Sequence, residues 1–405
     1  MAHDGVHGVG TLPGSVTGVS GRAGWLEDWR VAAALLTLAA AVAAAWVVLA
    51  VLAHRGGRRP RHPLPRRLAL AAFVALTALS GAGVAVNSYA GYAPDLATLV
   101  RTVPSLVGAR DSGATAATVL SGGRYPARLF SVVLREPADR IPPGRAWIYL
   151  PSGYSDPANR HRRYPVAYLL HGYPSSSYDW FGAGQVARIA SAMQAQGWLR
   201  PMILVSPDVS GGSVHDTECL DSTVGRPRIE TFLTRTVVGT VDRDLRTLAD
   251  RADRVLGGVS SGGFCTLNIG FRHQDEFGVL LALMPSGDPG RNAVRFMFHG
   301  DAVLGRLNSP SAYAPTMPLL ARQYVFLAAS LDDPDSVATA REMAGTLARR
   351  GVYAALRIDP AGLGHTWREA RREAPYALAF ASAHLGDPPA RRPLPPIPPL
   401  DKAHL

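Results

Sequence analysis

The segment Gly258-Val259-Ser260-Ser261-Gly262 has the residue pattern best suited to chemistry. A β-prone apolar run leads into it and a helix-forming run follows. A serine in a tight strand-to-helix turn projects its hydroxyl above the edge of a sheet, and the two flanking glycines let the turn close. The backbone N–H of Ser261 can then donate to a developing oxyanion. We therefore predict that Ser260 is a nucleophile, with Gly258 and Gly262 as its elbow glycines.

A nucleophilic serine needs a histidine as base, and His365 is the best placed of the histidines that follow Ser260. It lies in Gly362-Leu363-Gly364-His365-Thr366-Trp367, directly after a predicted strand. The glycines before it allow a loop to bring the imidazole over the sheet edge. His299 is the runner-up, but it follows no obvious strand.

The base needs an orienting carboxylate, and the sequence offers three of them together. The predicted strand Tyr324–Ala329 ends in Ser330-Leu331-Asp332-Asp333-Pro334-Asp335. We favour Asp333, because the proline after it disfavours α structure at that residue. Asp335 is expected to cap the next helix. Asp332 and Asp335 remain alternative acids.

A second oxyanion donor is expected after the predicted strand Val166–Leu170, which runs into His171-Gly172-Tyr173-Pro174. Gly172 lets the backbone approach a ligand, and the N–H of Tyr173 can donate. His171 itself is expected to form structural hydrogen bonds.

Strand-like and helical runs alternate over most of the chain, which predicts βαβ units and a mostly parallel sheet with helices on both faces. That arrangement, with serine, acid and histidine in this chain order, is typical of the α/β-hydrolase fold. The predicted strands are Leu129–Leu134, Ala146–Leu150, Val166–Leu170, Met202–Ser206, Arg254–Val259, Val279–Met284, Tyr324–Ala329 and Tyr353–Ile358. The predicted helices are Val186–Gln196, Ile229–Leu248, Phe264–His273, Asp335–Arg350 and Thr366–His384.

Two uncharged apolar runs, Val31–Ala53 and Leu68–Val86, are long enough to cross a bilayer as helices. The loop 54–67 between them holds six arginines, which favours the cytoplasmic side. Both flanks would then lie outside the cytoplasm. We predict a two-pass plasma-membrane protein with an extracytoplasmic catalytic domain. Its parts are a disordered head (1–30), two transmembrane helices (31–86), a connector (87–127), the catalytic domain (128–386) and a proline-rich tail (387–405).

The net charge of +11 is shared between the membrane region and scattered arginines, without an aromatic-interleaved basic stripe, so nucleic-acid binding has little support. The chain has two cysteines, Cys219 and Cys265, which would meet oxidising conditions outside the cytoplasm. We predict that they form a disulfide, with two buried thiols as the alternative. A zinc site is not expected.

The sequence resembles the esterase branch of the α/β-hydrolases that includes esterase D and the bacterial mycolyltransferases. The resemblance covers about residues 128–386, and the membrane region with Val86-Asn87-Ser88-Tyr89 resembles actinobacterial membrane-anchored members. It implies Ser260 as nucleophile, His365 as base and Asp333 as acid, with Tyr173 and Ser261 lining the oxyanion hole. The segments that carry it are 147–154, 164–172, 258–263 and 364–367.

These features predict a serine esterase or acyltransferase that acts on carboxylic esters through an acyl-enzyme, without a cofactor or metal. Its partners would be the lipid bilayer and a small-molecule or cell-envelope ester, with a sugar as a candidate acyl acceptor. The alternatives are a non-catalytic surface protein that binds carbohydrate or lipid, and a peptidase on the same fold.

Overall fold

The computed structural model describes residues 12–21, 24–56, 64–106, 115–120 and 123–386. The chain divides into two compact units, residues 22–99 and the remainder. Parts of the predicted head, of the arginine-rich loop (57–63) and the whole predicted tail (387–405) lie outside the described residues.

The unit 22–99 is a hairpin of two apolar helices, α2 (Trp29–Arg55) and α3 (Leu64–Ala90). Asp28 caps the first of them by accepting a hydrogen bond from the N–H of Arg30. Both helices are long and apolar enough to cross a membrane, and few of their residues are buried. They are therefore candidate membrane spans. The second helix continues through residue 90, so the connector begins four residues later than predicted.

The other unit contains the predicted catalytic residues and is called the catalytic unit for that reason. It is built on one mixed sheet, whose described strands run in the order β1-β2-β3-β5-β4-β6-β7-β8-β9. From β5 through β9 every neighbouring pair is parallel, whereas β1, β2 and β3 add an antiparallel edge. The strands are β1 (Thr115–Val119), β2 (Arg128–Glu136), β3 (Ile141–Leu150), β4 (Val166–Leu170), β5 (Ile203–Pro207), β6 (Arg254–Val259), β7 (Val279–Leu283), β8 (Tyr324–Ser330) and β9 (Tyr353–Asp359).

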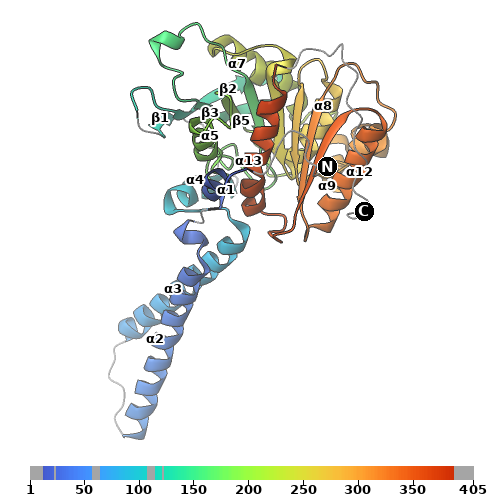
Figure 1. Cartoon of the computed structure of the whole chain (residues 1–405). Helices are drawn as coiled ribbons and strands as arrows, with labels where there is room; N and C mark the ends of the chain where they lie inside the picture. Colours follow the sequence, from blue (N-terminus) through green and yellow to red (C-terminus); the bar gives the residue numbers. More distant parts are fainter. Residues whose placement is uncertain (1–11, 22–23, 57–63, 107–114, 121–122, 387–405) are drawn as a thin grey trace, which may run out of the picture. The chain divides into compact units, whose positions relative to one another are not determined.

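Helices cover both faces of this sheet, as the uninterrupted burial of the central strands requires. Helices α8 (Ser261–Arg272) and α12 (Pro334–Arg349) pack on one face, and α5 (Val186–Ala195) and α13 (Trp367–His384) lie together on the other (Figure 1). This is the α/β-hydrolase fold. The shorter helices are α1 (Gly14–Ser20), α4 (Leu96–Leu106), α6 (Ile229–Thr231), α7 (Val238–Asp244), α9 (Gly290–Phe298), α10 (Ala302–Leu307) and α11 (Pro310–Tyr313).

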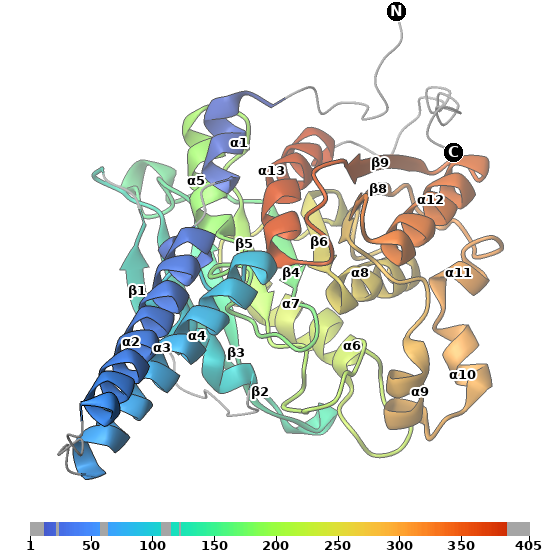
Figure 2. The same cartoon turned by 90° about the horizontal axis from the view of Figure 1, so that it is seen from below.

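The structure differs from the sequence expectation in the predicted disordered head. Residues 14–20 form α1, which packs against α5 and α13 and belongs to the catalytic unit (Figure 2). Val16 and Leu12 are buried in this contact, and the hydroxyl of Ser15 donates to Gln196. A sequence rich in glycine predicts disorder, but tertiary packing of two apolar side chains outweighs that preference here.

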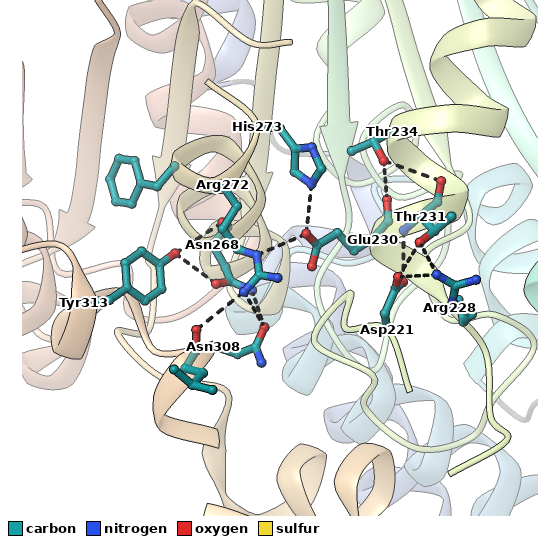
Figure 3. A network of polar contacts seen from close by, with 12 residues as sticks. Asp221, Arg228, Glu230, Thr231, Thr234, Asn268, Arg272, His273, Asn308 and Tyr313 are labelled. Atoms are coloured by element: carbon teal, nitrogen blue, oxygen red, sulfur yellow. Dashed lines mark hydrogen bonds and ion pairs between the residues drawn. The ribbon is translucent and has the colours of Figure 1, made fainter. Parts of the chain in front are cut away.

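The predicted helix 229–248 is also different, because Phe232–Val237 forms a π-helical segment between α6 and α7. Beside it, the buried carboxylate of Glu230 accepts from Arg272 (3.1 Å) and pairs with His273 (2.8 Å) at the end of α8 (Figure 3). Burial raises the pKa of Glu230, but the hydrogen bond from His273 and the charge of Arg272 lower it by more. This network ties the irregular helix to the helix that carries the candidate site.

Candidate active site

Ser260 stands in the turn between β6 and α8, with φ 59° and ψ −121°. This backbone conformation is rarely adopted by a residue with a side chain and is typical of strained functional turns. The turn closes only because its neighbours are glycines. A Cβ on Gly258 would lie 2.0 Å from the carbonyl oxygen of Gly262, and a Cβ on Gly262 would lie 2.2 Å from that of Leu170.

The structure brings Ser260, His365 and Asp333 together in one hydrogen-bonded line. The distance from His365 Nε2 to Ser260 Oγ is 2.7 Å, and that from His365 Nδ1 to Asp333 Oδ2 is also 2.7 Å. Burial raises the pKa of Asp333, but the hydrogen bonds from His365 and Ser336 and the charge of His365 together lower it by more, so its pKa lies below the ordinary value. An ionised Asp333 holds the proton of His365 on Nδ1, which leaves Nε2 free to accept the serine proton.

The two other aspartates of the cluster have different contacts. Asp332 Oδ1 accepts from the N–H of Gly364 (2.8 Å) and from the hydroxyl of Ser330 (2.7 Å), so it holds the loop that carries His365. Asp335 lies exposed in the first turn of α12. The cap of this helix is Asp333, which accepts from the N–H of Ser336 (3.3 Å), rather than the expected Asp335.

The two expected oxyanion donors flank the serine. Ser261 is the first residue of α8, so its N–H has no acceptor within the helix. On the other side, a Cβ on Gly172 would lie 3.1 Å from the Cβ of Ser260, which places the 172–173 peptide beside the hydroxyl. The buried ring of His171 pairs through Nδ1 with the carbonyl oxygen of Gly172 (2.8 Å) and accepts the N–H of Val209 at Nε2 (3.1 Å). Because the carbonyl and N–H of one peptide point in opposite directions, His171 orients the N–H of Tyr173.

Cys219 and Cys265 form a disulfide that joins the loop 215–219 to helix α8. The loop contains two consecutive residues with left-handed backbone, Glu218 (φ 44°) and Cys219 (φ 49°). Its Asp216 accepts a hydrogen bond from the hydroxyl of Ser261 (3.1 Å). The bridge therefore fixes a strained, acidic loop beside the nucleophile.

We expect the double variant Cys219→Ala/Cys265→Ala to lose about 2–4 kcal/mol of unfolding free energy, because the bridge closes a long segment of chain. Urea denaturation measures the loss. Dithiothreitol should destabilise the parent protein by a similar amount and leave the double variant unchanged. Equal stability with and without the bridge would contradict this role.

Two cavities lie on either side of Tyr173 and the 215–216 segment. One has a volume of about 180 Å³ and is lined by Arg101, Trp147, Tyr178 and the oxyanion loop 171–177. Arg101 comes from α4 and stacks over the rings of Trp147 (5.7 Å) and Tyr178 (5.4 Å). The other, of about 970 Å³, is lined by the 215–218 loop, Arg226 and helix α9. The hydroxyl of Tyr173 donates to the carbonyl oxygen of Val214 (2.7 Å) and so forms the partition between them.

One group of carboxylates in the described part of the chain is close enough to hold a cation, namely Asp359, Glu369 and Glu373. Arg357 donates two hydrogen bonds to Glu373, and Arg372 pairs with Asp359. Burial, together with the charges of Asp359 and Glu373, raises the pKa of Glu369 to about 9. The two arginines and the proton on Glu369 balance the negative charge of the three carboxyl groups, so no metal ion is needed to neutralise it.

The raised pKa of Glu369 predicts a pH-dependent stability. The folded protein keeps this proton between its ordinary pKa near 4.5 and about 9, whereas the unfolded chain releases it. The free energy of unfolding should therefore fall across this window, by at most about 1.4 kcal/mol per pH unit. We expect Glu369→Gln to reduce the loss of thermal stability between pH 5 and pH 8. Glu342→Gln, at an exposed position of α12, is the control and should retain the slope of the parent protein.

A family model described as putative esterase matches residues 144–333. Residues 144–333 are thus similar to this esterase family. The match contains Ser260 and Asp333 and ends before His365.

A feruloyl esterase fused to an endo-1,4-β-xylanase, from Xylanibacter ruminicola, is 30% identical over 162 residues, which is 38% of this chain and 22% of the relative. An uncharacterized protein of Corynebacterium glutamicum is 28% identical over 160 residues, or 38% of this chain and 37% of the relative. The chain thus matches between about a fifth and two fifths of the length of these curated relatives.

Solved structures support the fold of the esterase-family domain. A ferulic acid esterase superposes with a TM-score of 0.55 at 22% identity, covering 64% of this chain and 99% of that chain. An S-formylglutathione hydrolase from Agrobacterium tumefaciens gives a TM-score of 0.55 at 16% identity, covering 68% of this chain and all of the other. At such low identity these likenesses establish the α/β-hydrolase fold alone.

Several residues near the serine carry no signal in the sequence. Ser330 donates to Asp332 and accepts the N–H groups of Leu363 and Gly364, each at 3.1 Å, so it is part of the same loop clamp. Arg101 reaches its cavity from α4, which lies in the predicted connector, where a short helix near Asp95–Val103 is expected from the sequence. A search for polar residues at strand ends could have found Ser330, because it is the last residue of β8. No comparable rule would have found Arg101.

Proposed function

We propose that this chain is a membrane-anchored serine hydrolase or acyltransferase that acts on carboxylic esters. The observation that carries the proposal is the hydrogen-bonded line Ser260–His365–Asp333, beside a cavity whose lining includes Ser261 and Gly172. The family of residues 144–333 supports the same reaction class. A protein that only bound carbohydrate or lipid would have no need for an imidazole held between a serine hydroxyl and an ionised carboxylate.

The proposed reaction begins when Ser260 attacks the ester carbonyl and His365 takes its proton at Nε2. The N–H groups of Ser261 and Tyr173 donate to the oxyanion of the tetrahedral intermediate. The protonated His365 then donates its proton to the departing alcohol, which leaves an acyl-Ser260. Water, or a hydroxyl of an acceptor, transfers a proton to His365 and attacks the acyl group, and Ser260 is regenerated.

Hydrolysis of 4-nitrophenyl esters of graded chain length tests the reaction class and the size of the acyl pocket. Repeating the assay with trehalose, and looking for an acylated sugar, separates hydrolase from transferase. Esters should be cleaved and peptide anilides should not. A protein that cleaves anilides but no ester would refute the proposal.

The proposed location is the plasma membrane, with α2 and α3 crossing it and the catalytic unit outside the cytoplasm. Three observations support it: the arginine-rich loop, the disulfide, and the packing of α1 on α5 and α13. The two ends of a two-helix hairpin leave the membrane on one side, and α1 and the rest of the catalytic unit are joined to opposite ends of the hairpin. A membrane-impermeant maleimide should therefore label Asp156→Cys in intact cells and should not label Arg59→Cys. The reverse pattern would overturn this orientation.

A further inference from the structure

We propose that the larger cavity, beside the partition formed by Tyr173, is a subsite for an anionic group, a carboxylate or a phosphate, carried by the ester substrate. This inference rests on the proposed function, because it specifies the substrate class of the same site. Two residues that line the cavity, Tyr173 and Asp216, connect it to the turn that carries Ser260. Tyr173 follows the glycine that abuts Ser260, and Asp216 accepts from the hydroxyl of Ser261.

Helix α9 presents a basic stripe to this cavity. Arg291, Arg295 and His299 all line it, and they are spaced four residues apart. Residues at this spacing share one face of a helix. Another face of α9, with Met297 and Phe298, is buried in the protein core. The core contact of α9 therefore fixes the direction in which the stripe points.

A third arginine approaches the cavity from the loop 221–228. The guanidinium of Arg226 stacks over the ring of Phe296 at 4.0 Å, and the ring of His215 lies 4.5 Å from that of Phe296. The loop is tied to α9, because the hydroxyl of Ser222 donates to the carbonyl oxygen of Met297 (3.0 Å). Arg226 is thus held in place by the helix that carries the stripe, which reduces the conformational entropy lost when it binds a ligand.

These three arginines form no ion pair with any carboxylate among the residues that the structure describes. Other arginines of the same unit do: Arg254 pairs with Asp242 and Glu276, and Arg357 pairs with Glu373. The positive charge of Arg226, Arg291 and Arg295 is therefore available to bind an anionic ligand.

The acidic residues that share the cavity leave this excess charge in place. Burial and the nearby charge of Asp216 raise the pKa of Glu218 well above its ordinary value, which favours its neutral form. Asp216 accepts hydrogen bonds from Ser261 and from the N–H of Glu218 (3.0 Å). The three guanidinium groups outnumber the two carboxyl groups that line the cavity, which favours the binding of anions. Guanidinium groups bind carboxylate and phosphate oxygens with paired, charge-assisted hydrogen bonds.

The first experiment compares esters that differ only in charge. The acyl-side pair is mono-4-nitrophenyl succinate and its neutral methyl ester, and the alcohol-side pair is 4-acetoxybenzoate and its methyl ester. We expect the parent protein to prefer the anionic member of at least one pair. In Arg291→Gln/Arg295→Gln the ratio of kcat/KM between the anionic and neutral members should fall by about ten-fold or more. Arg306→Gln, an exposed arginine on α10 outside the cavity, is the matched control and should keep the parent ratio.

The second experiment does not depend on turnover. Inorganic phosphate should bind to Ser260→Ala in calorimetry, and adding the Arg291→Gln/Arg295→Gln substitutions should weaken that binding by ten-fold or more. Circular dichroism checks that each variant is folded. Cleavage of neutral esters with no charge preference, together with unchanged phosphate binding in the arginine variant, would overturn the anion subsite and leave the proposed function standing. Failure to cleave any ester would instead refute the proposed function, and the phosphate measurement would still decide the subsite.

Discussion

Replacing Ser260 with alanine is expected to lower kcat/KM for ester hydrolysis by roughly 10⁴-fold or more, because the acyl-enzyme can no longer form. Labelling by a fluorophosphonate probe, which reacts with an activated serine, should disappear as well. The substitution removes one hydroxyl whose hydrogen-bond partner, His365, is 45% exposed and can bind water instead. The folded structure should therefore survive, and circular dichroism checks this.

Ser286→Ala is the matched control for this experiment. Ser286 is an exposed serine in the loop after β7, and its hydroxyl donates to a backbone oxygen nearby. Its loss should leave both labelling and turnover intact. Persistent labelling of Ser260→Ala would show that another residue is the nucleophile and would overturn the mechanism.

The second large effect is expected for Asp333→Asn, which should lower kcat by roughly 10⁴-fold. The amide cannot hold the proton of His365 on Nδ1 as a carboxylate does, so the ring presents the wrong tautomer to Ser260. Asparagine still caps a helix about as well as aspartate does, so the role of residue 333 at the start of α12 is retained. The variant therefore separates catalysis from stability.

Asp332→Asn and Asp335→Asn complete the comparison. An amide oxygen at 332 can still accept from Gly364, and Asp335 has an exposed place in the first helical turn, so each variant should keep kcat within about ten-fold of the parent value. A loss at Asp332→Asn as large as that at Asp333→Asn would mean that the acid has been assigned to the wrong residue.

The sequence was sufficient to predict the layered sheet, because every strand after the first carries an apolar run that ends at a turn. It missed β1, whose Thr-Ala-Ala-Thr-Val segment is not distinguished from a loop. It also missed α9 to α11, which are short and lie where Gly and Pro are frequent. The predicted helix 229–248 is interrupted by a π segment at Phe232–Val237, and the long-range contacts of Glu230 with Arg272 and His273 just before it are not visible in local periodicity.

The candidate site was predictable to the extent that it depends on strand ends. Ser260, Asp333 and His365 each follow a parallel strand, and the carboxyl ends of parallel strands meet at one sheet edge. The residues that line the cavities near Ser260 were not predictable in the same way. Arg101, Arg226 and the α9 stripe come from loops and helices whose positions depend on packing between distant segments. The nearest signal was the spacing of Arg291, Arg295 and His299, which has meaning only once a helix is known to be there.

The position of α1 has a practical consequence for anyone who makes a soluble form of this protein. The catalytic unit consists of two segments of the chain, one before and one after the helical hairpin. A truncation that starts near residue 100 therefore also removes α1 with the buried Leu12 and Val16, and it exposes the apolar surface of α5 and α13 against which α1 packs. Such a truncation is expected to aggregate. A deletion that replaces only residues 22–99 with a flexible linker would keep the surface of α5 and α13 buried under α1. It is therefore the better starting point for purification.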